Sequence, residues 1–209
     1  MTASTAPAAP AAPAVPAVFT PRLPGTAAAA TVVWLVLAVI AGASGFLVRL
    51  PFPGPQVIIL SLVAITLSAG LASGSLRAWI DSIPLRVLVG VNGIRFIGIA
   101  FLLVAAQGQL DPVVAARAGW GDIAVATAAI ILAWAGTPRL LTLLWNALGV
   151  LDLVVAVGTA TAIALNGTTP GVTALFTLPL SLIPTFFVPL FLANHVFIFR
   201  RLLAPPRGR

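Results

Sequence analysis

Residues 140–158, LLTLLWNALGVLDLVVAVG, decide the fold, and the apolar run continues to Leu165. A transmembrane α-helix needs about 20 mostly apolar residues, so this stretch is long enough to cross a bilayer. One acid, Asp152, lies inside it. A carboxylate near the middle of a membrane costs at least about 2.5–3.5 kcal/mol unless it is paired or protonated. The stretch therefore predicts a transmembrane helix, and Asp152 requires a partner elsewhere in the chain.

The composition of the whole chain is that of an integral membrane protein. Of 209 residues, 60% are hydrophobic and only 7% are charged, and the mean hydropathy is +1.14. A soluble domain has about 25% charged residues, so this chain cannot cover a water-facing surface. The net charge of +7 comes from arginines without any lysine, and we interpret it as orientation information. We expect the lipid bilayer as partner and no nucleic acid.

Missing residue types exclude several kinds of site. The chain has no cysteine, which excludes disulfides, iron–sulfur clusters and thiolate nucleophiles. His195 is the only histidine, so one chain cannot supply an all-protein zinc site or a bis-histidine haem. There is also no nucleophile elbow, phosphate-binding glycine loop or pair of carboxylates within one apolar segment. We expect no enzymatic activity, no cofactor and no metal.

Six apolar segments predict an all-α fold, a polytopic membrane helix bundle. The Ala/Pro-rich residues 1–29 are predicted to form a disordered cytoplasmic tail, because repeated proline favours extended chain, and residues 204–209 a second tail. Residues 76–83 are amphipathic and predict a short helix in the headgroup region. The spans of the transmembrane domain, 30–203, are expected at about 30–48, 56–75, 85–106, 123–136, 139–165 and 175–203.

Two features of these spans have both a structural and a functional interpretation. Asp122 directly precedes the fourth apolar segment and is predicted to be a helix N-cap, with an external ion-attracting group as the alternative. Pro179, Pro184 and Pro189 interrupt the sixth segment and predict a kinked helix. The kink serves either as static packing or as a gating hinge, since broken helices line transport pathways.

The arginines predict the orientation. An even number of spans places both termini on one side, and two arginines, Arg49 and Arg117, then lie on the opposite side. Cytoplasmic loops carry an excess of positive residues, so both termini are expected in the cytoplasm. The arginines expected on the cytoplasmic side are Arg22, Arg77, Arg86, Arg139, Arg200, Arg201, Arg207 and Arg209.

Arg95, inside the third span, is the predicted partner of Asp152. It lies nine residues past Arg86, about 13 Å along a helix, and Asp152 lies thirteen residues past Arg139, about 20 Å. The long arginine side chain can bridge that difference. Polar groups from three helices are thus expected to share the cytoplasmic half of the membrane. This intramembrane polar centre comprises Arg95, Asp152, Asn146, Asn92, Asn194 and His195.

The polar centre supports three functional hypotheses. The leading one is a small, proton-linked transporter or channel-like protein, in which Asp152 titrates and His195 lies near the inner mouth. The alternative is a non-catalytic accessory or assembly subunit of a membrane complex, with the ion pair as a structural lock and a membrane-protein partner or second copy beside it. The third is a pigment- or haem-binding protein that uses His195. Transport predicts a water-accessible cavity touching Asp152, whereas a dry, packed pair counts against it.

Several short motifs carry a resemblance to a protein family. They are AGWGDI at 118–123 and WNALGVLDL at 145–153, with further likeness at RFIG, 95–98, and IPTFFVP, 183–189. Over roughly residues 77–201 the chain resembles small, uncharacterised bacterial multi-pass membrane proteins. The resemblance implies a six-helix bundle in the bacterial inner membrane and nothing about activity.

Overall fold

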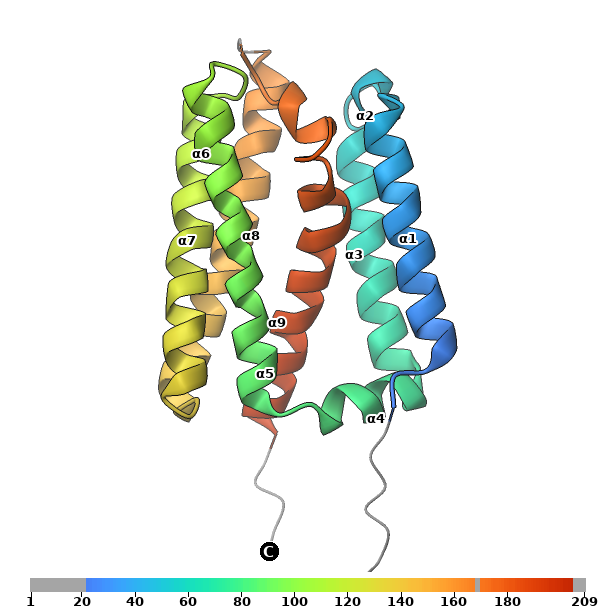
Figure 1. Ribbon diagram of the computed structural model, residues 1–209, viewed down its shortest axis with the longest axis vertical. Coiled ribbons are helices and arrows are strands. Elements are labelled where there is room, and N and C mark those ends of the chain that lie inside the picture. The colour runs from blue at the N-terminus through green and yellow to red at the C-terminus, as the bar shows by residue number, and fades with distance from the viewer. Residues whose placement is uncertain (1–21, 168–169, 205–209) are drawn as a thin grey trace, which may run out of the picture.

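Figure 1 shows a bundle of long helices that run side by side. The computed structural model describes residues 22–167 and 170–204. Within these ranges the regular secondary structure is helical, with no strand, and six helical segments are long and apolar enough to cross a membrane. The prediction of an all-α membrane helix bundle is confirmed.

The first span begins and ends five residues earlier than predicted. It is α1 (Gly25–Ala43), and Gly45, with a φ of +68°, separates it from the short α2 (Phe46–Arg49). The left-handed conformation at Gly45 ends the helix. Residues 1–21 and 205–209, most of the two predicted tails, lie outside the described residues. The other spans are α3 (Gly54–Ala72), the composite third span Leu85–Ala106, α7 (Pro112–Trp134), α8 (Arg139–Asn166) and the sixth span Ile183–Leu203.

The fourth span is longer than predicted, and the N-cap role of Asp122 is wrong. α7 begins at Pro112 rather than at 123, with Asp111 as its N-cap. The Asp111 carboxylate accepts a hydrogen bond from the backbone N–H of Val113 at 2.9 Å, and proline suits the first helical position. Asp122 therefore lies in the middle of the helix. The start of this span was predicted too late because Gly121, a residue typical of loops, precedes Asp122. In the structure this glycine lies within the helix and allows close helix packing.

The sixth span is shorter than predicted. Residues Thr173–Phe176 form a separate 3₁₀ turn, η2, and the membrane helix begins at a π-helical turn, η3 (Ile183–Phe187). This turn continues as α9 (Val188–Leu203). Pro184 lies in the first turn of η3, where a missing N–H costs least, whereas Pro189 lies where the π-helical turn passes into α9. The predicted single kinked helix over 175–203 is therefore wrong in extent, because Pro179 precedes the membrane helix, Pro184 is in its first turn and Pro189 is inside it.

The third span has the predicted ends but is not a uniform α-helix. It consists of α5 (Leu85–Gly90), the 3₁₀ helix η1 (Val91–Gly98) and α6 (Ile99–Ala106). Runs of 3₁₀ helix longer than 3–4 residues are uncommon, and a 3₁₀ stretch inside a helix often marks strain or a functional hinge. Arg95 lies in this 3₁₀ segment.

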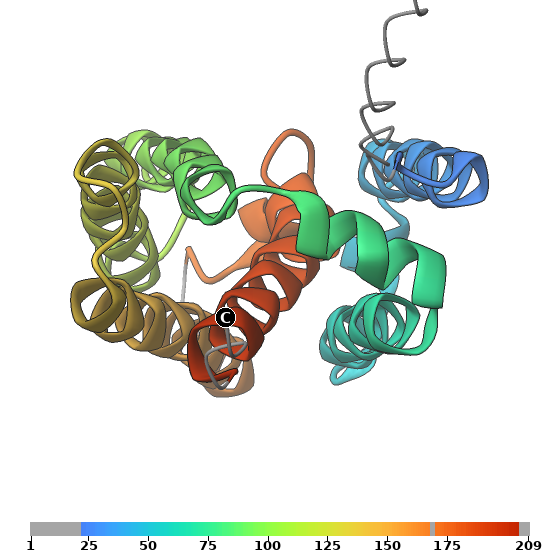
Figure 2. The same ribbon diagram turned by 90° about the horizontal axis from the view of Figure 1, so that it is seen from below.

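α7 and α9 organise the packing of the bundle. α7 contacts α5, η1 and α6 as well as α8, whereas α9 contacts α3 and α8. α1 lies at the edge and contacts α2 and η3. Seen from below, α4 (Gly74–Ser82), the segment predicted to lie among the headgroups, crosses the end of the bundle from α3 to α5 (Figure 2). The first described residues and the end of α9 lie at this same end.

Candidate functional site

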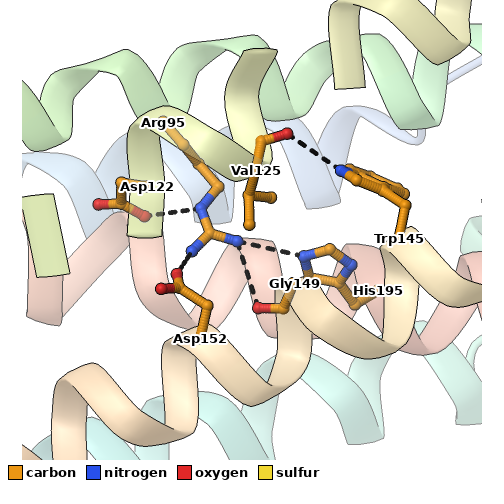
Figure 3. A network of polar contacts seen from close by, with 7 residues as sticks. All are labelled: Arg95, Asp122, Val125, Trp145, Gly149, Asp152 and His195. Atoms are coloured by element: carbon orange, nitrogen blue, oxygen red, sulfur yellow. Dashed lines mark hydrogen bonds and ion pairs between the residues drawn. The ribbon is translucent and has the colours of Figure 1, made fainter. Parts of the chain in front are cut away.

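A fully enclosed arginine lies at the centre of the bundle. Arg95 on η1 has no exposed surface. Its Nε donates to Asp122 Oδ1 at 2.7 Å, its Nη2 is ion-paired with Asp152 Oδ2, and its Nη1 donates to the Gly149 carbonyl at 3.3 Å (Figure 3). The guanidinium also lies over the Phe191 ring, 5.7 Å from its centroid. The predicted Arg95–Asp152 pair is formed, but a second carboxylate shares the arginine.

His195 on α9 lies beside the arginine and is held by Asn146 of α8. Its Nδ1 is 2.7 Å from Asn146 Oδ1, and Asn146 Nδ2 donates to the His195 carbonyl at 3.0 Å. Its Nε2 faces Arg95 Nη1 at 3.5 Å. Because a guanidinium has only donors, Nε2 acts as the acceptor and the imidazole is neutral with its hydrogen on Nδ1. Both ring nitrogens face protein groups, which leaves neither for a haem iron or a chlorophyll magnesium.

The other two predicted residues, Asn92 and Asn194, meet at a backbone carbonyl instead of at the ionic cluster. Both side-chain amides donate to the Leu88 carbonyl, at 3.1 and 2.9 Å respectively. Where α-helical pairing changes to 3₁₀ pairing, one carbonyl loses its N–H partner, because the hydrogen bonds shorten from four residues to three. Leu88 lies in the last turn of α5, just before η1 begins at Val91. The two asparagines therefore stabilise the transition from α5 to η1.

Asp122 is the residue of the cluster that sequence reasoning misplaced. It lies ten residues past Pro112, the first residue of α7, which is about 15 Å along the helix. Arg95 lies ten residues past Leu85, the first residue of its own span, which begins at the opposite end of the bundle. Both residues therefore lie near the middle of their helices. The signal that could have located Asp122 is Asp111-Pro112, a capping residue followed by proline at the first helical position. The ionic cluster thus lies near the middle of the bundle, and Asn146 and His195 extend it toward the end that carries α4.

Glycines make room for the charged groups. A Cβ added at Gly121 would lie 1.6 Å from Asp152 Oδ1, and one at Gly98 would lie 2.5 Å from Asp122 Cβ. A Cβ added at Gly149 would lie 2.5 Å from Cε1 of the His195 ring. Small residues allow helices to approach closely, and here they bring the carboxylates to the arginine.

A cavity of about 70 Å³ ends at Asp122. It lies between α3, α6, α7, α8 and η3, in the half of the bundle opposite the end that carries α4. Its walls are apolar apart from Asp122, Gln56 and Thr161. The expected contact with Asp152 is not made by this cavity, although that side chain keeps 14% of its surface exposed. The carboxylate within reach is the one on α7.

The cluster holds more negative than positive charge. One guanidinium faces two carboxylates, and among residues 22–167 and 170–204 no other arginine is paired with either of them. The same residues contain no group of three or more His, Asp or Glu side chains that could hold a metal ion. With both carboxylates ionised, the centre carries one excess negative charge in a low-dielectric environment. A proton or a bound monovalent cation restores the balance.

Comparison with known proteins identifies the family of this chain. Residues 52–203, more than half of the sequence, match the family described as Domain of unknown function (DUF8737). The chain belongs to this family. No curated protein matches the chain, and no solved structure matches it. The matched region contains the whole ionic cluster and every residue that lines the cavity, whereas α1 and α2 precede it. The site therefore lies within the part of the chain that matches the family.

Proposed function

We propose that this protein is a small, proton-linked transporter or channel-like protein with its site at Arg95, Asp122 and Asp152. One observation carries the proposal: two carboxylates from neighbouring helices share a single enclosed guanidinium, and one of them borders a cavity. Ionisable residues inside a membrane domain commonly mark ion pathways and proton relays.

Charge balance supports the link to protons. An uncompensated charge at the bilayer centre costs at least about 2.5–3.5 kcal/mol. The cluster is therefore most stable when one proton or one monovalent cation accompanies the two carboxylates. A site that must exchange one positive charge for another suits coupled transport.

Polar groups continue from the cluster away from the cavity. His195 and Asn146 are hydrogen-bonded to each other. Thr142 lies one helical turn before Asn146 on α8, nearer to the end of the bundle that carries α4. Thr142 is fully buried, and its Oγ1 has no hydrogen-bond partner among the described residues. These side chains supply a proton relay toward the end of the bundle that carries α4, and the cavity supplies access from the opposite end.

We infer that both termini are cytoplasmic and that the protein resides in the bacterial inner membrane. The positive-inside rule supports this orientation, because the bundle end that carries α4 holds most arginines of the described residues, whereas Arg49 and Arg117 lie toward the opposite end. The cavity then faces the outside of the membrane. The arginines at the α4 end are Arg22, Arg77, Arg86, Arg139, Arg200 and Arg201.

Proton flux into liposomes tests the proposal. The purified protein is reconstituted with an entrapped pH-sensitive dye, a pH gradient is imposed with potassium and valinomycin present to supply counter-charge, and monovalent cations are added outside, so that both proton uniport and one-for-one exchange can move protons. We expect flux with the parent protein and only the background of empty liposomes with Asp122→Asn. Asp81→Asn is the matched control, because Asp81 is an exposed carboxylate paired with Arg200 outside the cluster. Flux through Asp122→Asn equal to that of the parent would exclude the cluster as the proton site.

An accessory or assembly subunit of a membrane complex is the second candidate function. The enclosure of Arg95 favours it, because a satisfied ion pair also fixes helix packing. In that case the parent and Asp122→Asn should both show only the proton flux of empty liposomes, and a fixed membrane partner or a second copy should co-purify with the parent. Normal abundance with altered flux distinguishes transport from this alternative.

A further inference from the structure

The cavity above Asp122 has the size of a small-ligand site. Its volume is about 70 Å³. A cavity of about 150 Å³ binds benzene, so this one accommodates a molecule with fewer heavy atoms. Side chains such as Ile59, Phe101, Val114 and Leu153 make up most of its wall. The body of a matching ligand is therefore short and apolar.

Two hydrogen-bond acceptors with no partner within residues 22–167 and 170–204 lie among the polar residues that line the cavity, which are Asp122, Gln56 and Thr161. Asp122 gives Oδ1 to Arg95, but its Oδ2 accepts no hydrogen bond from a described residue, and Figure 3 shows that oxygen turned away from the guanidinium. Gln56 lines the cavity on α3, and its Oε1 likewise has no partner in the described chain. None of the arginines that the structure describes lines the cavity. A positively charged hydrogen-bond donor complements this lining.

We propose that the cavity binds a small amphiphilic monocation, a protonated aliphatic amine of a few carbon atoms. The ammonium group contacts Asp122 Oδ2, and the carbon chain packs against the apolar wall. This substrate class rests on the proposed transport function. The amine takes the place of the proton as the charge that compensates the second carboxylate, so one cation enters as one proton leaves and the net charge of the cluster stays constant.

Other ligand classes match the cavity less well. Calcium takes six to eight oxygen ligands and magnesium near-ideal octahedral coordination, whereas three polar side chains line this cavity. An anion would face the Asp122 carboxylate. A neutral apolar molecule would leave the excess negative charge of the cluster uncompensated.

Binding of n-propylammonium to the purified full-length protein in detergent micelles tests the proposal. Isothermal titration calorimetry should show saturable binding of this cation and none of 1-propanol or propionate, which have the same size but no positive charge. Asp122→Asn should weaken binding by about tenfold or more, because it removes a charge-assisted hydrogen bond.

Two alanines of α8 provide a matched pair of variants that leave the carboxylates unchanged. Ala160→Leu fills the cavity from its wall and should abolish binding. Ala147→Leu makes the same change at an exposed position of the same helix and should bind as the parent does. Equal binding of 1-propanol and n-propylammonium, unchanged binding by Ala160→Leu, or full displacement of the amine by an equal concentration of sodium would overturn the proposal.

The ligand class and the transport function can fail separately. Proton flux that depends on Asp122, together with no amine binding by the parent protein, would contradict the ligand class alone. Amine binding that depends on Asp122, together with no proton flux, would contradict proton-linked transport and leave the binding site in place.

Discussion

Replacing Arg95 with methionine should destabilise the bundle far more than neutralising a carboxylate. The variant keeps a long apolar side chain but removes the 2.7 Å bond to Asp122, the ion pair with Asp152 and the 3.3 Å bond to the Gly149 carbonyl. Removing one partner of a buried ion pair costs about 3–5 kcal/mol, because the remaining charge is left uncompensated. Two carboxylates are left here, so we expect the upper part of that range.

Asp122→Asn should have a much smaller effect, because it removes the excess charge. The asparagine oxygen can still accept the hydrogen bond from Arg95 Nε, and Arg95 and Asp152 remain as a balanced pair. The loss is the charge assistance of one hydrogen bond, so stability should stay within about 1 kcal/mol of the parent value.

Unfolding in mixed dodecylmaltoside–SDS micelles, followed by circular dichroism, measures these differences. Adding Asp122→Asn to Arg95→Met should recover part of the lost stability, and adding Asp152→Asn as well should recover more, because each change removes an unpaired charge. Equal destabilisation by Arg95→Met and Asp122→Asn alone would refute the reasoning from excess charge.

Three further changes test how the cluster and its helices are held. Gly121→Ala should lower the free energy of unfolding by about 1–3 kcal/mol in the same assay, because the added Cβ would lie 1.6 Å from Asp152 Oδ1. Gly158→Ala is the control and should be neutral or stabilising, because a Cβ added there would meet no atom of another described element within 4 Å. Asp111→Ala should cost about 0.5–2 kcal/mol and speed hydrogen exchange in the first turn of α7, since it removes the N-cap. Trp145→Phe should cost about 0.5–1.5 kcal/mol, because it loses a 3.0 Å hydrogen bond from the indole to a carbonyl of α7; an unchanged unfolding midpoint would contradict this.

Hydropathy predicted the spans well where apolar runs and turn signals agree. The segment predicted at 139–165 is α8, Arg139–Asn166, and Pro138 precedes its first residue. The prediction was poor for α7, whose mean hydropathy of 1.3 is below the 2.1 of α8. Arg117 lowers that value, yet its Nη1 donates to Thr159 Oγ1 at 3.1 Å on α8. Such a partner from another helix cannot be found by averaging along one segment.

The candidate site was predictable in part, because counting residues gives depth but not direction. Arg95 and Asp152 could be paired because the long arginine side chain can bridge the difference between their depths along the two helices. Counting could not show which helix face carries each group, so Asn92 and Asn194 were assigned to the cluster although they bind the Leu88 carbonyl. These contacts depend on the 3₁₀ segment, which a hydropathy pattern does not distinguish from an α-helix.

The 3₁₀ geometry of η1 explains why the cluster forms at this position. With 3.0 residues per turn, side chains three residues apart lie in one row, whereas an α-helix rotates them progressively. The buried residues of η1 are Asn92, Arg95 and Gly98, at steps of three. In an α-helix Gly98 would be turned about 120° away from Asn92, so one segment could not place the amide at its carbonyl and the glycine against Asp122. The helical irregularity and the shared arginine therefore occur together because the first aligns the residues that surround the second.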